Sequence, residues 1–158
     1  MTEGQLEGLL SEHGVDGLLV TAPANVRYLS GFTTPSDGRV LIERGGSRLI
    51  TDGRYDAQAA EESRLPVELR RDWLPWTAER MAGKRLGVEA DALSLAQARE
   101  LQSLANLELV PLQGIFAGRR MVKSEEEQAQ LREAAQLTSR AFEHILDFIE
   151  PGMKEVEV

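Results

Sequence analysis

Short apolar runs alternate with helix-like segments along the first 110 residues, and this alternation restricts the possible folds more than any other feature. Runs of four to six residues bounded by Gly, Pro, Asn or Asp are typical of buried strands. The strands that we expect cover residues 15–20, 39–43, 47–51, 66–70, 85–89 and 107–110, the last closed by Pro111. Arg44-Gly45-Gly46 joins the second and third strands as a hairpin turn, because glycine adopts the positive φ that such turns need.

Helix signals lie between these strands. Thr2 followed by Gln5 forms a capping-box pattern, and leucines recur at helical spacing up to Gly14. Further helices are expected over residues 55–63, 77–82 and 94–104, whereas residues 21–25 are expected to form a loop. Strands that alternate with helices predict an α/β fold in which helices flank both faces of a sheet, and the hairpin makes that sheet mixed.

One long amphipathic helix is expected after residue 120. Ser124 and Glu127 form another capping box, apolar residues then recur every three or four positions, and Pro151-Gly152 ends the pattern. The helix covers residues 124–149, which corresponds to a length of about 39 Å at 1.5 Å per residue. We therefore predict two parts, a domain over residues 1–120 and the start of a second domain over residues 121–158.

The ionisable side chains exclude several chemistries. The chain has no Cys, two His and a net charge of −8. It therefore offers no thiolate for a disulfide, a zinc site or a nucleophile, and its acidity argues against binding to nucleic acid, which needs a basic face. No apolar run approaches the ~20 residues that span a membrane, and the N-terminus lacks a signal-peptide pattern. We therefore expect no membrane partner and a cytoplasmic location.

Composition and motif spacing alone do not define a reaction. Nucleotide-binding and nucleophile-elbow patterns are absent. The two histidines, His13 and His144, are isolated in the sequence, which favours structural roles for both. The polar segment of residues 33–39 leaves two interpretations open. It is only a connection, or it displays Asp37 and Arg39 to a ligand or a partner.

Five short motifs follow one another along the chain. They are residues 25–32 (NVRYLSGF), 49–55 (LITDGRY), 86–89 (LGVE), 120–127 (RMVKSEEE) and 150–155 (EPGMKE). In this order they resemble the landmarks of the prolidase, Xaa-Pro aminopeptidase and creatinase family. Each motif is weak alone, but five in order over the whole chain are specific. We assign structural roles to the matching residues Asn25, Tyr28, Gly31, Phe32, Asp52, Arg54 and Tyr55.

The resemblance implies a two-domain hydrolase whose N-terminal domain is a mixed sheet with helices on both faces. Its pita-bread catalytic domain binds two divalent metals (Mn, Co or Zn) through two Asp, one His and two Glu, and it cleaves the bond before proline. The matching residues include none of these ligands, so we assign this chain no catalytic residue, no metal and no cofactor. We expect the chain to be a fragment, the non-catalytic N-terminal part of a parent enzyme and inactive alone.

The resemblance also implies what the N-terminal domain does. In the family it helps to form a homodimer and narrows access to the partner subunit's active site, where proline-containing peptides bind. The loop after Phe32 points toward that site, so Thr34, Asp37 and Arg39 are candidates for substrate gating. The guanidinium of Arg39 is suited to pairing with a substrate carboxylate. The alternative is that Arg39 is only a solvated residue at the start of a strand.

Two alternatives for the function stay open. One is a non-catalytic module of the same fold that binds peptides or proteins. The other is a fragment of a creatinase-type hydrolase, which keeps the architecture and changes the chemistry.

Overall fold

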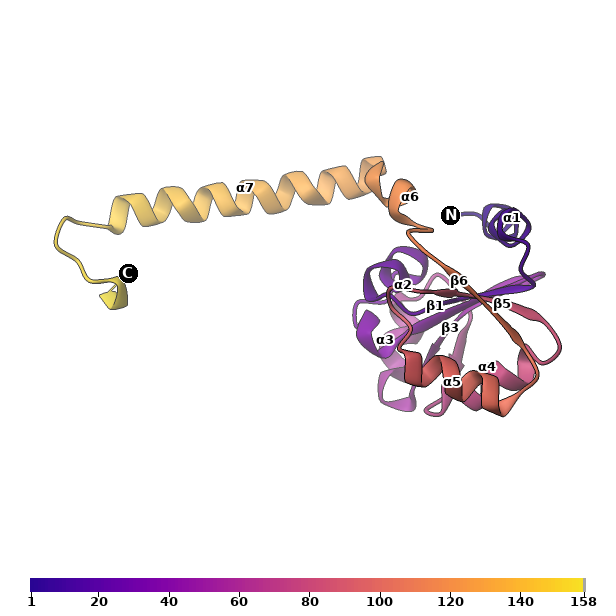
Figure 1. The fold of residues 1–158 in the computed structure, drawn as a ribbon. Coiled ribbons are helices and arrows are strands. Elements are labelled where there is room, and N and C mark those ends of the chain that lie inside the picture. The colour runs from indigo at the N-terminus through magenta and orange to yellow at the C-terminus, as the bar shows by residue number, and fades with distance from the viewer. Residues whose placement is uncertain (158) are drawn as a thin grey trace. The chain divides into compact units, whose positions relative to one another are not determined.

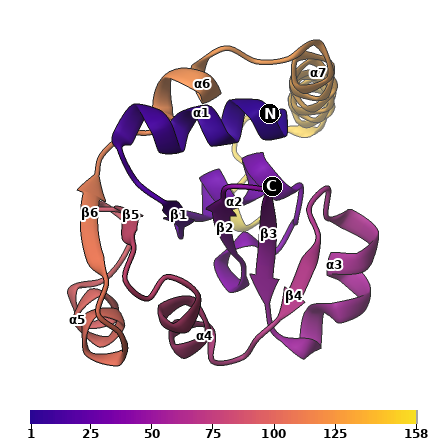
Figure 2. The ribbon, with the colours of Figure 1, turned by 90° about the vertical axis from the view of Figure 1, so that its right-hand side faces the viewer.

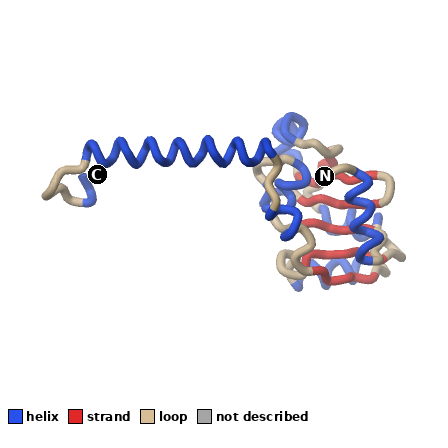
Figure 3. Tube along the Cα trace, turned by 90° about the horizontal axis from the view of Figure 1, so that it is seen from above, coloured by secondary structure: helices blue, strands red, loops and turns tan. Residues whose placement is uncertain are grey.

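A six-stranded sheet forms the centre of the first of two compact units, Met1–Ala117 and Gly118–Val158 (Figure 1). The computed structural model describes residues 1–157. The strands are β1 (Gly17–Val20), β2 (Arg39–Glu43), β3 (Gly46–Thr51), β4 (Val67–Leu69), β5 (Arg85–Glu89) and β6 (Glu108–Leu112), in the spatial order β4-β3-β2-β1-β5-β6. β2 is antiparallel to β1 and β3, and the other pairs are parallel. Figure 3 shows the strands side by side in one sheet. The predicted mixed sheet is therefore confirmed.

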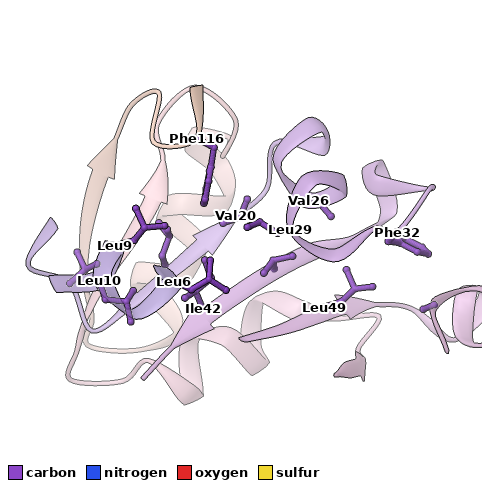
Figure 4. Close-up of a cluster of buried hydrophobic side chains, with 14 residues drawn as sticks. Leu6, Leu9, Leu10, Val20, Val26, Leu29, Phe32, Ile42, Leu49 and Phe116 are labelled. Carbon is purple, nitrogen blue, oxygen red and sulfur yellow. The ribbon is translucent and has the colours of Figure 1, made fainter. Parts of the chain in front are cut away.

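Helices α1 (Glu3–His13), α2 (Pro23–Ser30) and α3 (Asp56–Glu62) cover one face of the sheet. Helix α1 begins at the predicted capping box and ends at Gly14, whose φ of 61° lies in the left-handed region that favours glycine. The core on this face includes Leu6, Leu9, Leu10, Val20, Val26, Leu29, Phe32, Ile42, Leu49 and Phe116 (Figure 4).

Helices α4 (Trp73–Arg80) and α5 (Leu95–Leu104) cover the opposite face (Figure 2). Successive residues of a strand point to opposite faces, so Leu18 belongs to the first core and Leu19 to the second. Each large apolar side chain that is buried in this way contributes about 1.5–3 kcal/mol to folding. The prediction that helices flank both faces is confirmed.

The prediction that residues 21–25 form a loop is wrong, because helix α2 begins at Pro23. Proline is accepted in the first turn of a helix, where its missing N–H would have no helical partner. The residue at the N-cap is Ala22, whose side chain makes no capping hydrogen bond. The local sequence therefore lacks the usual signal for a helix start.

Glu89, the last residue of β5, caps α2 from a distance. Its side chain is only 3% exposed, and it accepts hydrogen bonds from the backbone N–H groups of Thr21 and Ala22, both at 2.6 Å. It also accepts a bond of 2.5 Å from Nδ2 of Asn25. These contacts join the carboxyl ends of the parallel strands β1 and β5 at the point where α2 begins. The helix dipole further favours a negative charge at this position.

Several other boundaries differ from the predicted ones, and β1 begins at Gly17 rather than at residue 15. Helix α4 begins at Trp73 rather than at residue 77, because its first turn packs against the second core and tolerates Pro75. Strand β6 continues through Pro111 to Leu112 rather than ending there. It is an edge strand, where a residue without an N–H is accepted.

The second unit is dominated by α7 (Glu125–Phe148), which begins at the predicted Ser124–Glu127 capping box. The short helix α6 (Ala117–Met121) precedes it, and a 3-10 turn at Glu155–Glu157 follows. No side chain of α7 is buried, and the described residues of this unit, 118–157, form no hydrophobic core of their own. The long C-terminal helix is confirmed, whereas the division of the chain at residue 120 stays a prediction.

The Glu89→Gln variant is expected to lower the free energy of unfolding by about 2–3 kcal/mol, because the neutral amide leaves buried donors without a charged acceptor. Urea unfolding of the chain measures the change. The matched control is Glu61→Gln on α3, where the side chain is exposed and the expected change is below about 0.5 kcal/mol. Equal stability of the two variants would contradict the capping role of Glu89.

Candidate functional site

The predicted functional segment lies at the edge of the sheet where β1, β3 and β4 end and β2 begins. The strand register places Arg39 beside Ile50 and Thr51 beside Leu69. A 3-10 turn, η1 (Pro35–Asp37), leads into β2 at this edge. In open α/β sheets, ligands usually bind outside the carboxyl ends of the parallel strands. The candidate gating residues lie at this end of the sheet, beside β2 and β3 rather than at the switch point between β1 and β5.

Arg39 carries a partly buried positive charge. Its Nη1 donates to the carbonyl oxygens of Ser36 at 2.9 Å and Gly38 at 2.5 Å, and its guanidinium lies 5.4 Å from the ring centroid of Trp73. Burial lowers the pKa of Arg39, and the neighbouring Asp37 only partly opposes this effect. Within residues 1–157, Arg39 forms no ion pair with a carboxylate. Such a cation is a candidate for binding an anion.

Arg54 links two carboxylates of this edge. Its Nη2 lies 2.6 Å from Oδ2 of Asp52 and 3.5 Å from Oδ1 of Asp37. Asp52 also accepts the backbone N–H of Arg54 at 2.8 Å and thereby caps the 3-10 turn η2 (Gly53–Tyr55). Hydrogen bonds from Arg54 lower the pKa of Asp52, and the same pairing raises the pKa of Arg54.

Aromatic packing connects this charged group to the core. The guanidinium of Arg54 lies 5.3 Å from the ring centroid of Tyr55, and that ring meets the buried Phe32 edge-on at 5.8 Å. Partial burial raises the pKa of Tyr55, and the nearby Asp37 adds to the increase. Phe32 of the first motif therefore packs against Tyr55 of the second, and Arg54 of the second motif pairs with Asp37.

Helix α3 fixes the start of the 33–39 loop. Glu62 accepts hydrogen bonds from the backbone N–H and the Oγ1 of Thr33, both at 2.7 Å, and these bonds lower its pKa. Nε2 of Gln58 donates to Oγ1 of Thr34 at 3.0 Å. At the other end, Oγ1 of Thr51 donates to the carbonyl oxygen of Asp37 at 2.9 Å. The loop is therefore anchored at both ends.

A cavity of about 150 Å³ opens at this edge. It is lined by Ser36, Asp37, Arg39, Ile50, Thr51, Asp52, Arg70, Arg71 and Trp73. The structure thus brings together three of the residues singled out in the sequence, Asp37, Arg39 and Asp52. Thr34 is not among the lining residues, and it contacts α3 instead.

Sequence reasoning missed three residues of this cavity, Arg70, Arg71 and Trp73. They follow β4, which is parallel to β3 and therefore ends at the same edge. Arg70 pairs with Oε1 of Glu68 at 2.7 Å. Two adjacent arginines at the end of the expected strand of residues 66–70 were a usable signal, but their position in space depends on which strand β4 joins.

The other motif residues serve the scaffold. Asn25 donates to Glu89, and Tyr28 packs against the first core. Gly31 ends α2 with a φ of 83°, and a Cβ at this position would lie 3.0 Å from the carbonyl oxygen of Glu62. Gly31 therefore permits the close approach of α2 and α3.

The described residues hold no metal-binding cluster. Across residues 1–157, no three His, Asp or Glu side chains are grouped in a way that could hold a metal ion. His13 lies in the last turn of α1, and His144 is exposed on α7. None of the described helices is both long and apolar enough to cross a membrane.

Comparison with known proteins identifies relatives of this chain. The family described as Creatinase/Prolidase N-terminal domain matches residues 4–122. The uncharacterized peptidase YqhT of Bacillus subtilis is 34% identical over 164 aligned positions, which cover 98% of this chain and 45% of the relative.

Solved structures share the fold. An Xaa-Pro dipeptidase from Bacillus anthracis matches with a TM-score of 0.85 and 31% identity, over 98% of this chain and 45% of that one. The N-terminal domain of the cytoplasmic peptidase PepQ from Mycobacterium tuberculosis has a TM-score of 0.66 and 31% identity, over 73% of this chain and 95% of that domain. This chain spans less than half the length of YqhT and of the dipeptidase. It belongs to the family of creatinase/prolidase N-terminal domains.

Proposed function

We propose that this chain is the non-catalytic N-terminal part of a metal-dependent Xaa-Pro peptidase of the aminopeptidase P or prolidase type. The observation that carries the proposal is the match of 98% of this chain to 45% of an Xaa-Pro dipeptidase. We assign the hydrolytic chemistry, and the two divalent metals (Mn, Co or Zn) that would support it, to residues outside this chain. The described residues offer no ligand cluster for them.

The proposed role of this chain is to gate the substrate within a cytoplasmic homodimer. Asp37 and Arg39 lie in a loop that is anchored at both ends, so they would meet a peptide with little reordering. Arg39 would pair with the carboxylate of a proline-containing peptide, because it forms no ion pair with a carboxylate within the described residues. Thr34 would act indirectly, by holding the loop on α3.

The proposal of a peptidase is tested with a protein that contains this chain and the remaining length of its relatives. With Mn²⁺ supplied, it is expected to hydrolyse Xaa-Pro peptides, and this chain alone is expected to be inactive. Hydrolysis of creatine without cleavage of Xaa-Pro peptides would identify a creatinase-type enzyme instead. A folded, metal-loaded protein without either activity would favour the peptide-binding module.

The gating role predicts the kinetics of an Arg39→Gln variant of that longer protein. Its KM is expected to rise about tenfold or more while kcat stays within about twofold, because a charge-assisted bond of 1.5–3 kcal/mol is lost from substrate binding. Steady-state kinetics on an Xaa-Pro dipeptide measure both constants. Arg99→Gln on the exposed surface of α5 is the matched control. An unchanged KM in the Arg39 variant would reject the contact with substrate.

The pairing of Asp52 with Arg54 predicts a pH dependence. The folded-state pKa of Asp52 is lowered, so the stabilisation from this pair is present above the ordinary carboxyl pKa and is lost as the pH falls through the folded-state pKa. Carboxyl ¹³C NMR titration of the chain measures the midpoint. Arg54→Met is expected to move it up toward the ordinary value, whereas Arg99→Met leaves it in place. A midpoint that Arg54→Met does not move would show that the pair has no effect on Asp52.

A further inference from the structure

Arg71 is a second cation of the cavity, and its charge helps to lower the pKa of Asp52. It is exposed and lines the cavity together with Arg39, and within residues 1–157 it forms no ion pair. The nearby Arg70 differs, because Glu68 already pairs with it at 2.7 Å. The chain as a whole carries a net charge of −8, yet this hollow holds two guanidinium groups that form no ion pair within the described residues.

The acidic side chains of the cavity are already engaged. Asp52 lies 2.6 Å and Asp37 lies 3.5 Å from Nη2 of Arg54, which is not a lining residue. Asp37 and Asp52 act on Arg39 and Arg71 only at longer range and form no ion pair with them, so both guanidinium groups remain available to a ligand. The two carboxylates also limit the charge of that ligand, because a dianion would be repelled by two aspartates at the same opening.

We propose that this cavity binds a small ligand through a single carboxylate group, with Arg39 and Arg71 as its cationic partners. A planar carboxylate matches the fork of a guanidinium, and its single charge meets less repulsion from Asp37 and Asp52 than a dianion would. Trp73 keeps the guanidinium of Arg39 in place by stacking at 5.4 Å and forms an apolar wall for the rest of the ligand. A volume of about 150 Å³ suits a ligand of the size of one amino acid.

This site extends the gating role proposed for Arg39. The identity of the ligand rests on the proposed function, under which the bound carboxylate is the free carboxyl group of a peptide. Arg71 is assigned to the same site as a specificity-determining residue. Binding itself requires only the residues of the first unit, so it is measurable without peptidase activity.

The test is an NMR titration of the ¹⁵N-labelled 158-residue chain with N-acetylproline at fixed ionic strength. We expect saturable shifts of the amides of residues 36–39, 51–52 and 70–73, and none with the neutral N-acetylproline amide. Arg71→Gln is expected to weaken binding about tenfold, Arg71→Lys to retain part of it, and Arg99→Gln to leave it unchanged. A thermal unfolding curve of each variant confirms that the fold is intact.

Three results would overturn the inference. They are no saturable binding of N-acetylproline, equal binding of its neutral amide, and tighter binding of inorganic phosphate at the same residues. Cleavage of Xaa-Pro peptides by the longer protein, together with no binding of N-acetylproline here, would reject this site and leave the proposed function standing. Binding without any peptidase activity in the longer protein would keep the site and reject the peptidase.

Discussion

The hydrogen bonds of the Glu89 carboxylate connect the ends of β1 and β5 to the start of α2. The arrangement of the first unit depends on this connection, because the order of the strands reverses there. The chain leaves β1 toward β2, β3 and β4, and then returns to place β5 on the other side of β1. Such a reversal opens a crevice between two neighbouring strands, and in many α/β proteins a ligand binds there. Here the protein's own carboxylate binds the backbone of Thr21 and Ala22 and the side chain of Asn25. The start of α2 is thereby fixed.

Glu89 bonds the backbone at that switch, and the cavity lies farther along the same end of the sheet, where β2 begins and β3 and β4 end. Three kinds of contact keep its shape. Thr51 bonds the backbone of Asp37, Glu62 bonds Thr33, and Arg54 joins the two aspartates. Asp37 and Asp52 therefore share a fixed partner in Arg54, whereas Arg39 and Arg71 form no ion pair within the described residues. This distribution of charge supports the proposed binding of an anion.

The second unit contributes differently. Helix α7 has a strong capping box at its start and an apolar stripe, but no buried side chain. Its formation thus relies on local hydrogen bonds and propensity, whereas most helices in folded domains are stabilised by packing of an apolar face. In the proposed parent enzyme, the additional length seen in the relatives would supply that packing.

The sequence alone determined the elements whose signals are local. The capping boxes of α1, α5 and α7, the glycine-rich hairpin turn and the apolar strands were all predictable, because neighbouring residues make the stabilising contacts. Asp37, Arg39 and Asp52 were also found from the sequence. Only the tertiary structure decided that α2 forms, because its capping carboxylate lies 64 or more residues away in the chain. It likewise decided that Arg70, Arg71 and Trp73 join the cavity, since the pairing of β4 with β3 is a long-range contact that no local pattern encodes.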